Sequence, residues 1–131
     1  MLVFLCRHAQ ATHGKPDGTR ELTPQGRVQA RALGELLAAR PDAPVLVLSS
    51  PLARARQTAE AIAHATGAPH RVAEQLAPGA TADALVESLA GETGPVACVG
   101  HQPDCSEIAL ALTGRDPGFP VAGMAEIELP A

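Results

Sequence analysis

The sequence predicts a three-layer α/β/α sandwich, with a mostly parallel central sheet and a C-terminal strand at the edge of that sheet. Short apolar runs alternate along the chain with segments whose apolar residues recur at helical spacing. The runs at 45–49 and 96–100 are almost continuously apolar, as expected for parallel strands that are covered on both faces. A length of 131 residues suits one domain over 1–131.

The expected elements follow from these patterns in order. We expect strands at residues 2–6, 45–49, 70–73, 96–100 and 124–129. We expect helices at residues 23–40, 50–67, 81–90 and 103–114. A tail rich in Gly and Pro over 115–123 is expected to cross the surface before the last strand.

The first expected helix has clear signals at both ends. Thr23 suits the N-cap and Pro24 the first helical position, while Arg40-Pro41 ends the helix. The residues expected to face the core are Val28, Ala32, Leu36 and Leu37 in this helix, Leu52, Ala55, Ala59, Ile62 and Ala63 in the second, and Leu85, Val86 and Leu89 in the third.

Composition limits the partners and the compartment. The formal net charge is −4, so the broad basic surface that nucleic acid or an anionic membrane requires is not expected. Three cysteines without disulfide spacing indicate a reducing, cytoplasmic environment. No stretch approaches the ~18 apolar residues of a membrane span. We expect a monomer that needs no cofactor.

Cationic and imidazole side chains follow three of the expected strands. Arg7 and His8 come directly after the first strand, Arg54 follows the second, and His101 follows the fourth. Because the carboxyl ends of parallel strands meet at one edge of a sheet, we expect these side chains to lie together. Such a cluster would repel itself without an anion, and it therefore predicts a phosphate site.

Each part of this site has a chemical reason. Arginine presents a planar fork of donors that matches phosphate oxygens. The helix that starts at Ser50 adds free N–H groups at its N-terminus, and Thr58 lies one turn beyond Arg54 on the same helix face. Gly100, just before His101, allows a close approach of backbone to ligand. Two arginines and two histidines balance a dianion, so no metal is expected.

Four motifs resemble those of a known family. Arg7–Ala9 resembles its RHG signature, Leu22–Gly26 its Leu-Thr-x-x-Gly element, Ser50–Ala59 its Ser-Pro-Leu-x-Arg segment, and Val99–Pro103 its second histidine motif. They match in order and spacing over most of the chain. The sequence resembles the histidine phosphatase (phosphoglycerate mutase-like) superfamily, and its short length resembles the SixA-type phosphohistidine phosphatases.

The resemblance implies roles for the matching residues. His8 would be the nucleophile, forming a phosphohistidine intermediate that water hydrolyses. Arg7, Arg54 and His101 would hold the phosphoryl oxygens and stabilise their charge. The implied substrate is a phosphorylated molecule, with a histidine-phosphorylated protein favoured, and no metal is implied.

The general acid is the open part of the resemblance. Longer relatives carry a Glu after the third strand, for which Glu74 is the nearest candidate here and Asp104 the second, or no residue fills the role. The chain between Arg54 and His101 leaves no length for an insertion that covers the site. An open site suits a phosphohistidine on a protein, and such a substrate suffers less from losing an acid worth ~10²–10⁴-fold. The roles of Gln10 and His13 stay open.

Three alternatives compete with this interpretation. A small-molecule phosphomonoesterase of the same superfamily would need a working acid at Glu74 or Asp104. A sensor that binds phosphate without turnover would need no nucleophile. A zinc site would draw its ligands from Cys6, His8, Cys98, His101 and Cys105. The remaining histidines, His13, His64 and His70, are expected at the surface.

Overall fold

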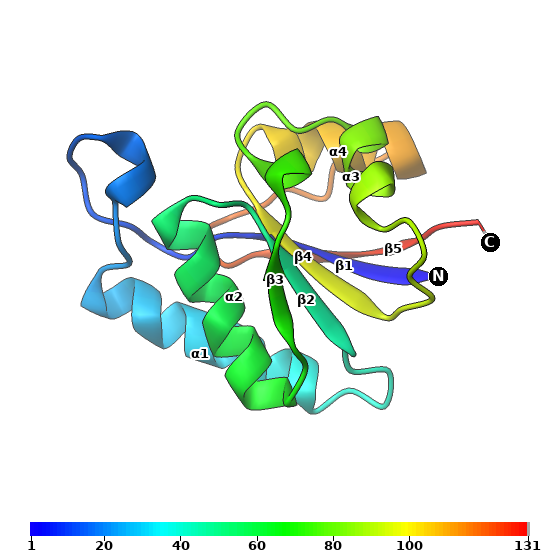
Figure 1. Cartoon of the computed structure of the whole chain (residues 1–131), viewed down its shortest axis with the longest axis horizontal. Coiled ribbons are helices and arrows are strands. Elements are labelled where there is room, and N and C mark those ends of the chain that lie inside the picture. The colour runs from blue at the N-terminus through cyan, green and yellow to red at the C-terminus, as the bar shows by residue number, and fades with distance from the viewer. Residues whose placement is uncertain (131) are drawn as a thin grey trace.

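A five-stranded sheet between two helical layers forms the molecule, as the computed structural model describes it for residues 1–130 (Figure 1). The strand order is β3-β2-β4-β1-β5. The elements are β1 (Leu2–Arg7), η1 (Asp17–Thr19), α1 (Pro24–Ala38), β2 (Leu46–Ser49), α2 (Ala53–Thr66), β3 (His70–Val72), η2 (Glu74–Leu76), α3 (Ala82–Ser88), β4 (Val96–Gly100), α4 (Asp104–Thr113) and β5 (Met124–Glu128). The predicted layers are therefore confirmed.

The sheet is parallel except at one edge. β4 pairs in parallel with both β1 and β2, and β3 pairs in parallel with β2. β5 runs antiparallel to β1 at the edge, with Leu2 opposite Glu128. The central β4 is buried along its whole length, which explains why that segment of the sequence is apolar throughout.

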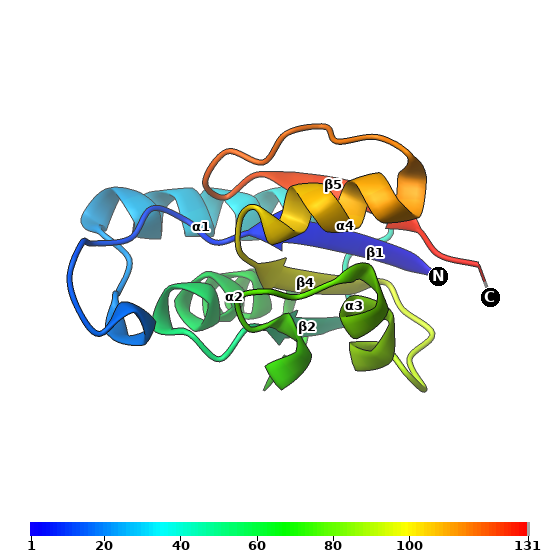
Figure 2. The same ribbon diagram turned by 90° about the horizontal axis from the view of Figure 1, so that it is seen from above.

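The side chains of alternate residues in each strand lie on opposite faces of the sheet. In β1, Val3 and Leu5 pack with the residues of α3 and α4, whereas Phe4 and Cys6 pack with those of α1 and α2. Figure 1 shows the sheet between these two layers, and Figure 2 looks onto its face, with β5, β1, β4 and β2 side by side and α4 in front of them. The period of two in a strand thus divides one apolar run between two cores.

The buried face of α1 differs from the predicted one. Val28, Ala32 and Leu36 were expected inward, but Ala32 is exposed and Val28 and Leu36 are 60% and 56% exposed. The residues that α1 buries are Gly26, Ala30, Leu33, Gly34 and Leu37. The reason is the close approach of α2: a Cβ at Gly34 would lie 2.8 Å from the carbonyl oxygen of Ala61. The packed face therefore combines Leu33 and Leu37 with the small residues Gly26, Ala30 and Gly34, and the small residues let α2 approach.

The other helices follow the expected pattern with one exception. α2 buries Ala55, Ala59 and Ile62, and α3 buries Leu85, but Val86 is 46% exposed. No helix among residues 1–130 is both long and apolar enough to cross a membrane.

Candidate active site

Three of the expected side chains lie together at the carboxyl edge of the sheet. His8 directly follows β1, His101 directly follows the neighbouring β4, and Arg54 is the second residue of α2. The two imidazole rings are 5.3 Å apart between centroids, and Arg54 Nε donates a hydrogen bond to His8 Nε2 at 3.3 Å. All three residues are buried. The rule that parallel strands end at a common edge therefore located this cluster.

The His8 ring is held in one orientation by the backbone. Its Nδ1 is 2.7 Å from the carbonyl oxygen of Ala9, and since a carbonyl can only accept, the proton lies on Nδ1. The His8 amide also donates to Gly100 O at 3.1 Å. Burial, followed by the charges of Arg54 and Arg7, lowers the pKa of His8 to about 4. At neutral pH the ring is uncharged, and Nε2 carries a lone pair beside a cation.

Arg54 is fixed by a residue that the sequence analysis did not single out. Its Nη1 donates to the carbonyl oxygen of Asp17 at 2.9 Å, and its Nη2 donates to Asp17 Oδ2 at 3.1 Å. Asp17 opens η1 in the segment that projects beyond α1 and α2 (Figure 1). The Arg20 and Arg54 guanidinium groups lower the pKa of this carboxyl. Asp17 does not lie at the end of a strand, so the pattern of strand ends in the sequence did not indicate this residue.

Arg7 is held by the tail before β5. Its Nη1 donates to Phe119 O at 3.0 Å, and its backbone amide donates to Gly123 O at 2.9 Å. The Nε atom of Arg7 is buried without a hydrogen-bond partner among residues 1–130. The tail also touches His8, whose carbonyl oxygen accepts from the Ala122 amide at 3.0 Å. The tail was expected to cross the surface, but it also forms part of the site.

His101 contacts a buried hydroxyl. Its Nε2 lies 2.7 Å from Ser50 Oγ, and its Nδ1 is buried without a hydrogen-bond partner in the described chain. Burial, followed by the charges of Arg54 and His8, lowers the pKa of His101 to about 4. The ring is therefore neutral at pH 7, like that of His8.

Thr58 and Gly100 support the site from within the protein. The Thr58 hydroxyl accepts from the Ala9 amide at 3.0 Å and donates to Arg54 O at 2.8 Å. The hydroxyl therefore already acts as both an acceptor and a donor within the protein, and contact of Thr58 with a ligand stays a prediction. A Cβ at Gly100 would meet only Cys105 Sγ, at 4.0 Å. The protein itself does not need glycine there, and approach by a ligand stays a prediction too.

The two candidate acids differ in their surroundings. Asp104 is 7% exposed, and its Oδ2 accepts from the amides of Gly79 and Ala80 at 2.8 and 3.2 Å. This carboxylate holds the loop before α3. Glu74 is exposed at the start of η2, after the edge strand β3. β3 lies three positions from β1 in the sheet, roughly 14 Å at the usual strand spacing.

The cysteines of the zinc alternative point into different cores. Cys6 packs on the side of α1 and α2, whereas Cys98 and Cys105 pack on the side of α3 and α4. Among residues 1–130, no group of three or more His, Cys, Asp and Glu is placed to hold a metal ion. Alternation along a strand separates residues that the sequence spacing alone had suggested as partners.

The other histidines differ in their exposure. His13 and His64 are exposed, as expected, but His70 is half-buried, with Nε2 2.8 Å from Ser49 Oγ.

A match to a family model covers residues 3–78, more than half of the chain, and that model describes branch 1 of the histidine phosphatase superfamily. The chain belongs to this superfamily. The histidine phosphatase is also 36% identical to an uncharacterized protein of Picosynechococcus sp., over 95% of this chain and 82% of that protein. The resemblance found in the four motifs is thus confirmed by the match of whole segments.

Solved structures agree with this membership. A SixA protein of Agrobacterium tumefaciens is 32% identical, with a TM-score of 0.82 over 95% of this chain and 89% of the other. A protein histidine phosphatase SixA in complex with tungstate is 27% identical, with a TM-score of 0.87 over 98% and 88%. A mycobacterial glucosyl-3-phosphoglycerate phosphatase is 25% identical, with a TM-score of 0.73 over 95% and 90%. The histidine phosphatase is therefore similar to SixA-type structures over nearly its whole length.

Proposed function

We propose that this histidine phosphatase removes the phosphoryl group from phosphohistidine side chains of proteins, through a covalent intermediate on His8. The observation that carries the proposal is the state of the His8 ring. Its Nδ1 proton is held by Ala9 O at 2.7 Å, and its Nε2 is unprotonated at neutral pH because the pKa is about 4. A neutral imidazole with a directed lone pair is the form that attacks phosphorus.

In the first step, the hydrogen bond from Arg54 Nε to His8 Nε2 breaks, and the freed lone pair of Nε2 forms a bond to phosphorus. The bond from phosphorus to the substrate nitrogen breaks, and its electron pair returns to the departing imidazole. That imidazole leaves as a neutral ring when its other nitrogen carries a proton, so no acid has to protonate the leaving atom. The charges of Arg7 and Arg54 stabilise the oxygens of the transferring group.

In the second step, water attacks the phosphoryl group on His8. The bond between Nε2 and phosphorus breaks, the electron pair returns to Nε2, and the proton of the water goes to phosphate or solvent. Because Ala9 O keeps the proton on Nδ1, His8 also leaves as a neutral imidazole. The same hydrogen bond thus assists both steps.

The substrate class rests on the carboxylates. Departure of an alcohol needs a proton on the bridging oxygen, and Asp104 is occupied with two backbone amides. Departure of an imidazole has no such requirement. Only short elements, β3, η2 and α3, lie between α2 and β4, so nothing there encloses a small ligand. The likeness to a protein histidine phosphatase in complex with tungstate, a tetrahedral oxyanion, supports the same choice.

A second candidate is a small-molecule phosphomonoesterase. The likeness to a mycobacterial glucosyl-3-phosphoglycerate phosphatase favours it, and so does the exposure of Glu74 near the carboxyl edge. In that case Glu74→Gln should lower turnover of alkyl phosphates by ~10²-fold or more. If the proposal for phosphohistidine holds, the same variant should leave dephosphorylation of a phosphohistidine protein within about threefold.

The deciding experiment measures phosphate release from a protein that carries phosphohistidine and from an aryl phosphate. Native protein is compared with His8→Ala and with His64→Ala, which removes an exposed histidine of α2. A rapid quench should trap a phosphoenzyme that is stable in base and labile in acid, in the native and His64→Ala proteins only. Turnover that persists in His8→Ala would refute the mechanism, and absence of turnover on either substrate would favour a phosphate-binding sensor.

A further inference from the structure

The hydroxyl of Ser50 has a restricted set of partners. Ser50 is fully buried, and its Oγ accepts a hydrogen bond from the Leu52 amide at 3.2 Å. Its other contact is His101 Nε2, at 2.7 Å. A hydroxyl carries one proton, and a buried proton without an acceptor costs about 1–3 kcal/mol. The amide of Leu52 cannot accept, so the only acceptor in these contacts is the ring nitrogen.

This accounting fixes the tautomer of His101. If the Ser50 proton is donated to Nε2, then Nε2 is unprotonated and the single ring proton lies on Nδ1. The reverse arrangement would make Ser50 Oγ accept twice, and it would leave both the Ser50 proton and the buried Nδ1 lone pair without a partner among the described residues, whereas the first arrangement leaves only the Nδ1 proton. The atom that receives the proton, Nδ1, is buried and has no hydrogen-bond partner among the described residues. A buried donor of this kind can be satisfied by an acceptor on a bound ligand, such as a phosphoryl oxygen.

The two histidines then share the Nδ1–H tautomer, but they use it differently. His8 keeps its proton on Nδ1 against Ala9 O and presents Nε2 as a lone pair. His101 keeps its proton on a nitrogen that lacks a partner among residues 1–130, with the ring tilted 56° from that of His8. One ring can therefore attack phosphorus while the other offers an N–H group to a phosphoryl oxygen.

We propose that Ser50 is a positioning residue, which donates its hydroxyl proton to His101 Nε2 and so makes His101 Nδ1–H a hydrogen-bond donor for a phosphoryl oxygen of the substrate. The inference rests on the proposed function for the identity of the ligand, but the tautomer itself does not depend on turnover. A neutral donor aimed at an oxygen that gains charge accelerates the reaction without a reorganisation of the site.

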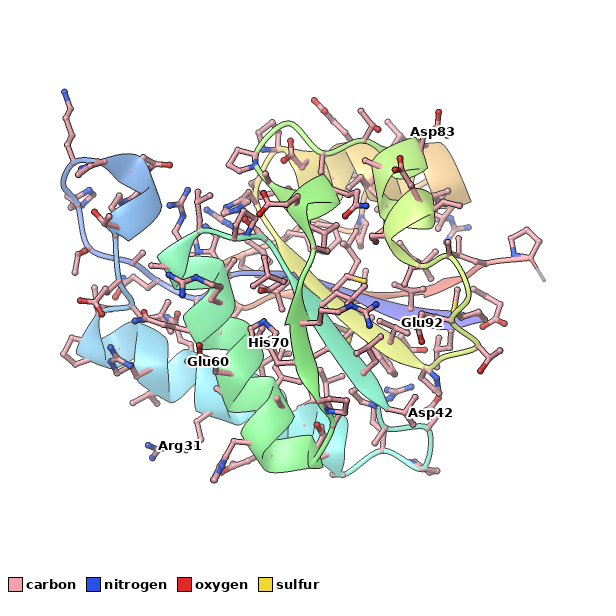
Figure 3. All side chains as sticks on the ribbon, viewed as in Figure 1. Arg31, Asp42, Glu60, His70, Asp83 and Glu92 are labelled. Atoms are coloured by element: carbon pink, nitrogen blue, oxygen red, sulfur yellow. The ribbon has the colours of Figure 1, made fainter. Side chains whose placement is uncertain are left out.

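The chain offers a matched control for Ser50 in its neighbour. Ser49 is equally buried, but its Oγ donates to Ser50 O at 3.0 Å and lies 2.8 Å from His70 Nε2. His70 belongs to the edge strand β3, beside Glu60 of α2 (Figure 3). Ser49→Ala thus removes a buried hydroxyl of the same size without touching the ring of His101.

The test records the imidazole nitrogen signals of ¹⁵N-labelled, ligand-free protein at pH 7, with His101→Gln used to assign the His101 pair. We expect a pyrrole-like Nδ1 and a pyridine-like Nε2 in the native protein and in Ser49→Ala, and averaged signals in Ser50→Ala. Titration with inorganic phosphate should shift the Nδ1–H proton in the native protein. An Nε2–H tautomer in the native protein would overturn the proposal.

Kinetics complete the test. Ser50→Ala should lower kcat by about ten- to a hundredfold, less than the loss of a whole donor, whereas Ser50→Thr, which keeps a hydroxyl, should recover most of it and the native tautomer. An unchanged tautomer in Ser50→Ala, or a kcat within twofold of native, would refute the role. If native protein turns over no phosphohistidine but the nitrogen signals behave as stated, the proposed function fails and the assignment of Ser50 stands.

Discussion

The contact between α1 and the loop after His8 yields a quantitative prediction for Gly26→Ala. A Cβ at position 26 would lie 2.0 Å from the carbonyl oxygen of Gln10 and 2.9 Å from its carbonyl carbon. Both are backbone atoms, and Gln10 O also accepts from the Thr23 amide at 3.1 Å. To restore an ordinary contact, the helix and the loop must separate by more than about 1 Å.

The expected cost has two parts. Overpacking against a fixed backbone costs typically ~1–3 kcal/mol or more, and the better helix propensity of alanine returns at most about 1 kcal/mol. We therefore expect a loss of about 2 kcal/mol in the free energy of unfolding. Gln10 follows Ala9, whose carbonyl oxygen holds the His8 ring. A displacement near 1 Å at this point should lower kcat by roughly 10²-fold.

Urea unfolding and turnover of a phosphohistidine protein measure the two effects. The control is Gln25→Ala, an exposed position in the same helical turn, which should leave both quantities close to native. If Gly26→Ala unfolds at the native midpoint and keeps kcat within twofold, the helix and loop relax at little cost, and the steric reasoning is wrong.

Three further predictions follow from the site. Asp17→Asn should lower kcat about tenfold, because Arg54 loses the carboxylate that orients it. Orthophosphate should bind as well as to the native protein or better, because a negative charge near the site disappears. Weaker orthophosphate binding together with the lower kcat would indicate collapse of the loop instead. The pKa of about 4 for His8 and His101 in the folded protein lies below the ordinary value of 6.5. Between pH 4 and pH 6.5 the unfolded chain therefore binds more protons than the folded protein, and the free energy of unfolding should rise with pH over this range. The slope of the free energy of unfolding against pH should be smaller in His101→Gln. Asp104→Ala should lower the free energy of unfolding by about 1–3 kcal/mol, because the amides of Gly79 and Ala80 lose their acceptor, but it should not change the turnover of phosphohistidine. If the folded variant loses more than tenfold in kcat, Asp104 is the general acid and this prediction is wrong.

The site was predictable where it depends on strand ends. Arg7 is the last residue of β1, and His8 and His101 directly follow β1 and β4, so sequence order alone placed them at one edge. Asp17 lies in a loop whose path is set by tertiary contacts, and no periodicity marks it. The buried face of α1 was mispredicted because Gly34 allows α2 to approach, whereas hydrophobic size favoured Leu36.

The pairing of β1 has a consequence for the order in which the protein acquires its site. β1 is made first, but its two neighbours in the sheet, β4 and β5, are the last strands to be made. The tail that holds Arg7 and the His8 carbonyl leaves the ribosome later than every helix. A nascent chain therefore carries an unpaired β1 and an unassembled anion site until β4 and β5 have been synthesised. Phosphatase activity should arise in a single late event of folding, without partly active precursors.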